Sequence, residues 1–292
     1  MQDPEELDAL AAPALGAVDP RTRMGAVELT VADLPRSLDY YTGAIGLEVL
    51  ADDDSEASLG TGGRELLHLR ALPGACPADG YTGLFHFALL LPERTDLARW
   101  LSHAAATRVG LTGASDHFVS EAIYLRDPDG HGIEVYWDRP RALWEGQVSR
   151  IGTWPLDVES LLGELDVPRD PGFGGLPAGT TMGHVHLRVA DVDETVRFYR
   201  DALGFGLMTQ LGPQAAFLSA GGYHHHLGAN TWESRGAPAA PPGYATLDHA
   251  TVVFPGSEER DLAAGRLEDA GHRLDGWLVR DPSHNALLLE VD

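Results

Sequence analysis

Residues 24–33 read Met24-Gly-Ala-Val-Glu-Leu-Thr-Val-Ala-Asp33, and residues 182–191 repeat them, 158 positions later, as Met182-Gly-His-Val-His-Leu-Arg-Val-Ala-Asp191. The segments behind them match as well, since Tyr40-Tyr41-Thr-Gly-Ala-Ile-Gly46 corresponds to Phe198-Tyr199-Arg-Asp-Ala-Leu-Gly204. An internal repeat of this kind indicates a chain built from copies of one supersecondary unit.

A second pair of matching segments divides each copy again. Residues 81–92 read Tyr81-Thr-Gly-Leu-Phe-His86-Phe-Ala-Leu-Leu-Leu-Pro92, and residues 244–255 read Tyr244-Ala-Thr-Leu-Asp-His249-Ala-Thr-Val-Val-Phe-Pro255. Apolar residues alternate in the opening segments, as in strands, and recur at helical spacing behind Asp33, a residue type favoured as a helix N-cap. Gly46 is typical of a helix end. We therefore predict an α+β protein of four β-α-β-β-β modules that form two pseudo-barrel domains.

The predicted domain boundaries follow the repeat. Residues 1–22 are acidic, rich in Ala and Pro and without periodicity, so we expect a mobile N-terminal tail. Modules one and two would form the first domain, residues 23–140, and modules three and four the second, residues 181–292. Between them, residues 141–180 are a connector rich in Pro, Gly and Asp, with one short helix near residues 158–165.

Composition excludes several classes of protein. The 292-residue chain has 21 basic and 44 acidic residues and a formal net charge of −23, which argues against a nucleic-acid partner, because such binding rests on neutralising phosphates. It contains no lysine, so Schiff-base and P-loop chemistry are excluded. A single cysteine, Cys76, allows no internal disulfide and no cysteine-based metal site. No apolar run is long enough to cross a membrane and no secretion signal is found, so we expect a cytoplasmic protein without a membrane partner.

Several features together resemble the vicinal oxygen chelate superfamily, which includes glyoxalases, bleomycin resistance proteins and extradiol dioxygenases. They are the repeated modules, the histidines of the opening strands, the helix end at Gly204, and the ending Asp127-Pro-Asp-Gly-His-Gly-Ile-Glu134. The four-module layout, with Ser219-Ala-Gly-Gly-Tyr-His-His-His226, is similar to bacterial extradiol enzymes of the catechol 2,3-dioxygenase type. The resemblance covers about residues 24–292.

This resemblance implies a cofactor and partners. In such enzymes the metal is Fe(II), sometimes Mn(II), held by two histidines and one carboxylate, with a further histidine and a tyrosine assisting nearby. A ligand set of this kind leaves open positions at the metal for substrate and O2. The implied partners are a small aromatic diol and O2, and homo-oligomers are frequent in this fold family.

Module two has the complete spacing of this ligand set. His86 stands on its first predicted strand, and Glu134 stands on its last, seven residues after Asp127. Tyr124, ten residues before Glu134, matches the assisting tyrosine, and His117 lies just ahead of it. The resemblance therefore assigns His86 and Glu134 to the metal, and Tyr124 and His117 to hydrogen bonds with the bound oxygens.

Module three supplies the third ligand, His184, where module one offers only Ala26 and Glu28. It also carries three consecutive histidines, residues 224–226, whose side chains alternate between the faces of a strand. In the family the assisting histidine precedes a polar residue or a histidine, then an aliphatic and a small residue. The stretch His225-His226-Leu-Gly fits this order, so His225 is the acid/base candidate.

Module four offers a weaker alternative. His249 is placed like His86, but Leu288 stands seven residues after Asp281, and Glu290 stands two residues further on. Two strand residues span about 7 Å, whereas ligand distances tolerate about 0.2 Å, so the register favours module two. Two sets stay open: modules two and three with His86, Glu134 and His184, which we favour, or modules three and four with His184, His249 and Glu290.

These residues predict an Fe(II)-dependent extradiol dioxygenase that opens catechol or a substituted catechol beside its diol and yields a 2-hydroxymuconic semialdehyde-type product. His225 would move a proton to and from the substrate, because a histidine pKa near neutrality suits a general acid and base. Two alternatives stay open. One is a hydroquinone dioxygenase or glyoxalase-like metalloenzyme of the same fold, and the other is a metal-free resistance protein that binds aromatic compounds or drugs.

Overall fold

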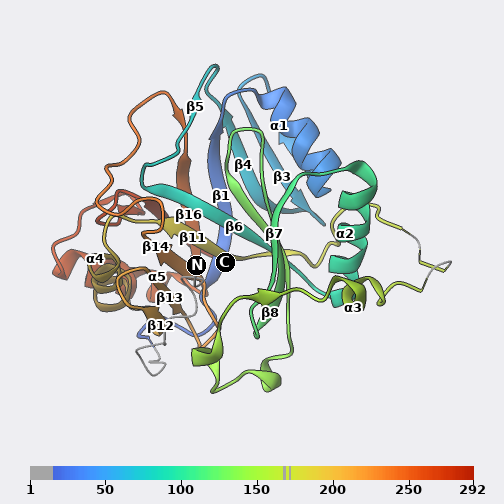
Figure 1. Cartoon of the computed structure of the whole chain (residues 1–292). Coiled ribbons are helices and arrows are strands. Elements are labelled where there is room, and N and C mark those ends of the chain that lie inside the picture. Colours follow the sequence, from blue (N-terminus) through green and yellow to red (C-terminus); the bar gives the residue numbers. More distant parts are fainter. Residues whose placement is uncertain (1–15, 167–168, 171) are drawn as a thin grey trace.

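The computed structural model describes residues 16–166, 169–170 and 172–292 (Figure 1). Each of the four predicted modules is present and consists of one strand, one helix and three further strands. Module one comprises β1 (Arg23–Val31), α1 (Leu34–Tyr40) with the π-helical turn η2 (Tyr41–Ile45), β2 (Glu48–Asp52), β3 (Glu56–Thr61) and β4 (Arg64–Ala71). Module two comprises β6 (Gly83–Leu91), α2 (Arg94–Thr107), β7 (Leu111–Asp116), β8 (Ser120–Arg126) and β9 (Gly132–Asp138).

The second half of the chain repeats this order. Module three comprises β11 (Thr181–Arg188), α4 (Val192–Val196) with η5 (Arg197–Leu203), β12 (Gly206–Leu211), β13 (Ala215–Ser219) and β14 (Leu227–Asn230). Module four comprises β16 (Leu247–Phe254), α5 (Ser257–Asp269), β17 (Leu274–Asp275), β18 (Leu278–Arg280) and β19 (Ala286–Val291). The connector holds η3 (Arg141–Leu143), η4 (Val148–Arg150), β10 (Trp154–Pro155) and α3 (Val158–Leu162), and β5 (Cys76–Pro77) pairs with β15 (Tyr244–Ala245).

The repeated sequence produces the repeated helix boundaries. The Asp33 side chain accepts a hydrogen bond from the Arg36 backbone N–H at 3.1 Å, and Asp191 does the same for Glu194 at 2.8 Å. Both are N-caps, which satisfy backbone donors that have no partner within the helix. Each helix ends in a π-helical turn followed by a glycine in the left-handed region, Gly46 with φ 91° in the first case. The same local signals therefore direct the chain from the first strand into the helix and out again in both modules.

The strands form two large sheets, and each sheet combines one module from the first half of the chain with one from the second half. An eight-stranded sheet, in the order β17-β18-β19-β16-β1-β4-β3-β2, joins module four to module one. A nine-stranded sheet, in the order β10-β7-β8-β9-β6-β11-β14-β13-β12, joins module two to module three. In Figure 1, β1 from the blue end of the colour bar runs beside β16 from its red end. The predicted α+β fold of four modules is confirmed, with open curved sheets in place of closed barrels.

The sheets do not follow the predicted division into residues 23–140 and 181–292. The reason is that β6 of module two finds its antiparallel neighbour in β11 of module three, across the connector. The consecutive modules are held together differently, by a buried hydrogen bond from the Tyr41 hydroxyl to Asp127 Oδ2 at 2.8 Å. Its counterpart in the other half joins Tyr199 to Asp281 at 3.0 Å.

The predicted tail, residues 1–22, lies mostly outside the described residues. The backbone N–H groups of Ala17 and Val18 both donate to the Gly204 carbonyl, at 2.6 and 3.0 Å. Val18 and Thr22 are buried, so this last part of the tail is packed against module three. Among the described residues, no helix combines the length and the apolar character needed to cross a membrane.

Candidate metal centre

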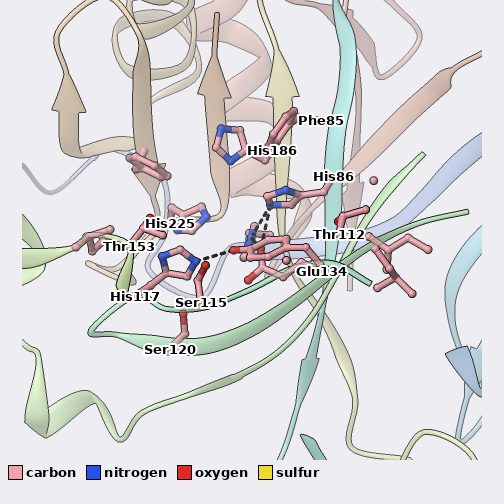
Figure 2. Close-up of a pocket in the computed structure, with 18 of the residues that line it drawn as sticks. Phe85, His86, Thr112, Ser115, His117, Ser120, Glu134, Thr153, His186 and His225 are labelled. Carbon is pink, nitrogen blue, oxygen red and sulfur yellow. Dashed lines mark hydrogen bonds and ion pairs between the residues drawn. The ribbon is translucent and has the colours of Figure 1, made fainter. Parts of the chain in front are cut away.

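Three strands that lie side by side, β9, β6 and β11, bring the predicted ligands of modules two and three together. His86 Nε2 lies 3.2 Å from His184 Nε2. Glu134 Oε2 lies 3.0 Å from His86 Nε2 and 3.1 Å from His184 Nε2. All three side chains are buried, and Figure 2 shows His86 and Glu134 directed at the same point.

A divalent cation would fit this group. Ligand bonds of about 2.1 Å at right angles place neighbouring ligand atoms about 3.0 Å apart, on one face of an octahedron. The three observed separations of 3.0 to 3.2 Å match such a face. Two unprotonated imidazole nitrogens at this distance direct their lone pairs into the same space, which a cation would stabilise. The donor set is the one that suits Fe(II) with open positions left for other ligands.

The electrostatics of the group favour the protonation states that bind metals. Burial raises the pKa of Glu134, but attraction to His184 and the hydrogen bonds from His184 and His86 outweigh it and hold that pKa well below its usual range. Burial first, with the neighbouring His86 and His224, lowers the pKa of His184 against the opposing effect of the Glu134 carboxylate. The low pKa of Glu134 keeps its carboxylate charged, which is the state that metal ligation needs.

A glycine in β11 makes room beside the centre. A Cβ atom on Gly183 would lie 1.8 Å from the Tyr136 hydroxyl oxygen, closer than any real contact. The Tyr136 ring in turn lies 5.0 Å, centroid to centroid, from the ring of His184. The pairing of β11 with β6 also shifts register between Met182 and His184, where this glycine stands. The sequence Gly-His in the repeated opening strand is thus tied to the placement of the histidine.

The predicted assisting pair lies in hydrogen-bonding contact on the hairpin of module two. His117 Nε2 lies 2.7 Å from the Tyr124 hydroxyl, and His117 Nδ1 lies 2.8 Å from the Gly152 carbonyl oxygen. Because a carbonyl only accepts, Nδ1 carries the proton and a neutral His117 accepts from Tyr124 through Nε2. Both side chains line the pocket, and Figure 2 shows His117 facing it.

The three consecutive histidines lie in the segment before β14 (Leu227–Asn230), so the predicted alternation between the faces of a strand is wrong, and only one of them lines the pocket. The ring of His225 lines the pocket and lies 4.0 Å, centroid to centroid, from that of His184. His224 and His226 both pack against Tyr223, on the other side of the chain. Burial lowers the pKa of His226 to about 3, and its Nδ1 accepts a hydrogen bond from the Ala220 backbone N–H. Of the three, only His225 therefore reaches the candidate centre.

A pocket of about 320 Å³ adjoins the three ligands. Pockets of this size suit small ligands, and most of their lining is apolar. Sequence reasoning did not identify its walls, because they come from β7, β13, the connector and the segment after β14, without a shared spacing. Its lining includes both aromatic rings and hydroxyl groups, from Phe85, Thr112, Ser115, Thr153, Phe217 and Trp232.

His186 is a further polar residue of this wall. It lies opposite His86 in the pairing of β11 with β6 and is 3% exposed. Its ring packs above Gly228, where a Cβ atom would approach it to 2.8 Å. Burial holds its pKa well below the usual range, so the ring is neutral, and its Nε2 has no hydrogen-bond partner among the described residues.

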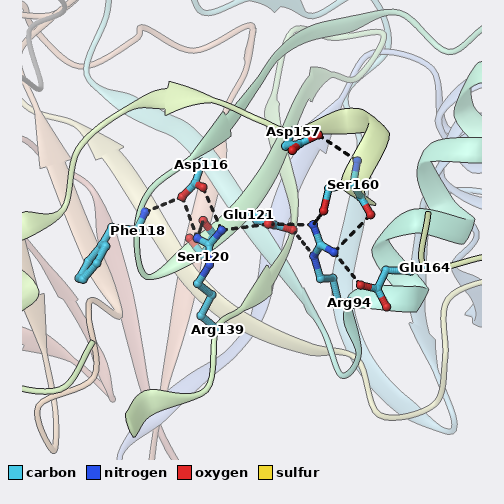
Figure 3. A network of polar contacts seen from close by, with 9 residues as sticks. All are labelled: Arg94, Asp116, Phe118, Ser120, Glu121, Arg139, Asp157, Ser160 and Glu164. Carbon is cyan, nitrogen blue, oxygen red and sulfur yellow. Dashed lines mark hydrogen bonds and ion pairs between the residues drawn. The ribbon is translucent and has the colours of Figure 1, made fainter. Parts of the chain in front are cut away.

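A network of charged residues braces the hairpin that carries His117 and Tyr124 (Figure 3). Glu121 of β8 accepts hydrogen bonds from Arg94 at 2.7 Å and from Arg139 at 2.9 Å. Arg139 also binds Asp116, the residue before His117, at 2.7 Å, and Arg94 reaches Glu164 beyond α3 at 2.6 Å. The strand, the connector and α2 are thereby held in one arrangement around the pocket.

The alternative ligand set is not brought together. His249 lies on β16 of the eight-stranded sheet, beside Glu28 and Asp248, whereas His184 belongs to the other sheet. Glu290 is exposed near the end of β19. The cluster around His249 already contains a cation, since the Arg70 guanidinium contacts Glu28 and lies 3.6 Å from Asp248. Among the described residues, the group with His184 consists of His86 and Glu134.

Comparison with known families gives one match that spans most of the chain. The model described as "Glyoxalase/Bleomycin resistance protein/Dioxygenase superfamily" matches residues 23–135 and again residues 181–287. The two matches correspond to the two halves of the internal repeat.

A curated relative matches nearly end to end. "Catechol-2,3-dioxygenase" from Bacillus subtilis (strain 168) is 43% identical over 287 residues, which cover 92% of this chain and 97% of that protein. "Glyoxalase domain-containing protein 4" from Mus musculus is 29% identical over 113 residues and covers 37% of this chain.

Solved structures share the fold. Glyoxalase I from Zea mays superposes with a TM-score of 0.54 at 18% identity, covering 92% of each chain. The cppA protein from Streptococcus pneumoniae TIGR4 superposes with a TM-score of 0.55 at 12% identity, covering 95% of this chain and all of that one. At these identities the likeness concerns the arrangement of the strands and helices.

Proposed function

The chain belongs to the glyoxalase/bleomycin resistance protein/dioxygenase superfamily, and on that ground we propose that it is an Fe(II)-dependent extradiol dioxygenase. Its substrate would be catechol or a substituted catechol, opened beside the diol to a 2-hydroxymuconic semialdehyde-type product. The observation that carries the proposal is the close triad of His86, Glu134 and His184 at the pocket. The 43% identity to a catechol-2,3-dioxygenase supports the same reaction.

The proposed ligands of the metal are His86, Glu134 and His184. Two neutral imidazoles and one carboxylate would leave a net positive charge at the centre, which favours an anionic diol. Fe(II), or Mn(II) in its place, would lower the pKa of the diol and hold it next to O2. All three ligands are buried, and the low solvent access of these side chains strengthens the charge interactions between them.

The proposed acid and base is His225. Burial and the neighbouring histidines, His184 first, hold its pKa well below the usual range, so the ring is neutral in the free protein and is a weaker base than the near-neutral histidine expected from the sequence. Tyr124 would hold a substrate oxygen from the other wall of the pocket through its hydroxyl oxygen, and His117, with both ring nitrogens engaged, would orient that hydroxyl. Their mutual hydrogen bond at 2.7 Å fixes the direction of both side chains before a substrate arrives.

The rival functions make different demands on the site. A glyoxalase-like enzyme would use a fourth protein ligand, and His225, whose ring lies 4.0 Å from that of His184, is the candidate. Among the described residues His225 does not join the group of three ligand atoms, which favours a centre with open positions. A metal-free binding protein would not require three buried ligand atoms at the mutual spacing of one face of an octahedron.

The decisive test is oxygen uptake by protein purified without chelator and loaded with Fe(II) under anaerobic conditions. We expect steady O2 consumption with catechol, equimolar with ring-opened product measured by absorbance, and no consumption with hydroquinones. Uptake with hydroquinone alone would assign the sister reaction instead. Protein that binds no divalent metal at all, measured by elemental analysis, would contradict the proposal and favour the binding protein.

A further inference from the structure

A directed chain of hydrogen bonds ends at Asp138, at the end of β9, and begins at the acid/base candidate. His225 Nδ1 lies 2.8 Å from His224 Nδ1, and His224 Nε2 lies 2.8 Å from Asp138 Oδ1. The second carboxylate oxygen of Asp138 accepts a hydrogen bond from the Tyr223 hydroxyl at 2.6 Å. His224 is fully buried, so water does not compete for its two nitrogens.

The chemistry of the last acceptor fixes the direction of every bond in this chain. A carboxylate only accepts, so His224 Nε2 carries a proton and donates it to Asp138. With His224 in its one-proton form, the proton on Nε2 leaves Nδ1 as an acceptor. Because His225 Nδ1 faces that acceptor, it must be the donor. The one nitrogen of a neutral His225 that is left with a lone pair is Nε2.

We propose that Asp138 and His224 are positioning residues that hold His225 in the tautomer with the proton on Nδ1 and a free lone pair on Nε2. The inference rests on the proposed role of His225 as the base of the reaction. Imidazole in water populates both tautomers, and only the one with a free Nε2 accepts a proton at that atom. The bond to His224 also fixes the orientation of the ring, which otherwise packs against His184 and Phe217.

The environment of Asp138 supports this direction. Burial raises the pKa of Tyr223 well above its usual range, and nearby Tyr136 and Asp138 raise it further, so the phenol keeps its proton and donates it. Tyr136 lies 2.8 Å from Tyr223 and donates to the phenol oxygen in turn. Tyr223 thus donates to one carboxylate oxygen of Asp138, Oδ2, and the other, Oδ1, faces His224 Nε2.

The test compares Asp138→Asn with Tyr223→Phe. The first variant keeps the shape of the side chain but replaces an obligatory acceptor by an amide that also donates. The second removes the other hydrogen bond of the same carboxylate and leaves the bond to His224 in place. We expect kcat of the iron-loaded enzyme to fall about 100-fold in Asp138→Asn, at equal iron content and with KM within about threefold, and to change less than about threefold in Tyr223→Phe.

A second measurement separates this inference from the proposed reaction. Nitrogen-15 NMR of the metal-free full chain reports which ring nitrogen of His225 carries the proton, with His225→Gln used to assign the signals. We expect one tautomer, protonated at Nδ1, in the wild type and in Tyr223→Phe, and a mixture or the opposite tautomer in Asp138→Asn. Wild-type protein protonated at Nε2, or an unchanged tautomer and kcat in Asp138→Asn, would overturn the inference. Absence of any ring opening by the wild type would instead count against the proposed function, since the NMR result stands without turnover.

Discussion

The Nε2 atoms of His86 and His184 lie 3.2 Å apart, although 98 positions separate the two residues in the chain. They come from different modules, and Glu134 of a third strand contacts both. In the metal-free protein the Glu134 carboxylate accepts hydrogen bonds from both nitrogens, and a divalent cation bound by all three atoms would take the place of these protons.

Glu134→Ala removes the one negative charge of the triad and with it the affinity for the metal. We expect less than about a tenth of the wild-type iron content after dialysis, because metal affinity rests on the deprotonated ligands. The exposed Glu145 provides a matched control, since Glu145→Ala removes a carboxylate from the connector without touching the pocket. Elemental analysis of both variants checks the assignment, and full iron stoichiometry in Glu134→Ala would refute it.

His225→Phe separates metal binding from proton transfer. The substitution keeps an aromatic ring at this position but removes the nitrogen that accepts the proton. We therefore expect wild-type iron content and a kcat lower by about 10² to 10⁴. Steady-state oxygen uptake together with iron analysis of the same sample measures both quantities. Turnover at the wild-type rate would show that another group accepts the proton.

Gly183→Ala tests how closely Tyr136 is packed beside His184. The added methyl group would lie 1.8 Å from the Tyr136 hydroxyl, so the strand or the ring must move. Overpacking of this kind lowers the free energy of unfolding by about 1–3 kcal/mol. Gly110→Ala adds the same methyl group where no atom lies within 4 Å and is the control. Urea denaturation of both variants gives the comparison, and equal midpoints would contradict the close packing.

Acid should destabilise the metal-free protein through its buried histidines. The pKa of His226 falls from an ordinary value of 6.5 to about 3 on folding, so the folded state binds fewer protons than the unfolded state between these values. Its contribution is complete above pH 6.5 and is lost as the pH falls toward 3. At pH 5 the loss amounts to about 2 kcal/mol, from 1.36 kcal/mol per pH unit. His226→Asn keeps an acceptor for the Ala220 N–H, so we expect its stability to fall less between pH 7 and pH 5 in denaturant titrations. An equal fall in both proteins would show that His226 is protonated in the folded state.

Much of the fold could be predicted from the repeat, because local signals act within each module. Asp33 and Gly46 begin and end a helix wherever the same residues recur. The recurrence of Tyr41 as Tyr199 has a cause that spacing alone does not reveal. Each hydroxyl binds the aspartate of a turn in the following module, at 2.8 Å to Asp127 in the first half. The partner of a side chain 86 positions away depends on packing that no local pattern encodes.

The candidate site likewise has a part that the sequence predicts and a part that depends on packing. Its ligands have a family spacing, so His86 and Glu134 could be placed on strands before the structure was known. The groups around them could not be placed in this way. Thr153 reaches the pocket from a connector without periodicity, and Asp138 acts through His224, which looks like any other member of a histidine run.

Because each sheet contains strands from both halves of the chain, neither sheet can be completed until late in translation. β1 is synthesised before the other strands, whereas β16, one of its two neighbours, is synthesised near the end. In the same way, β6 is synthesised well before its neighbour β11. A nascent chain stalled in the connector would expose two unpaired strand edges, the kind of surface that recruits other chains into aggregates. Such an intermediate would carry two of the three proposed metal ligands, His86 and Glu134, and could not yet enclose an ion. Translation speed and chaperone access after the second module should therefore influence the yield of this protein.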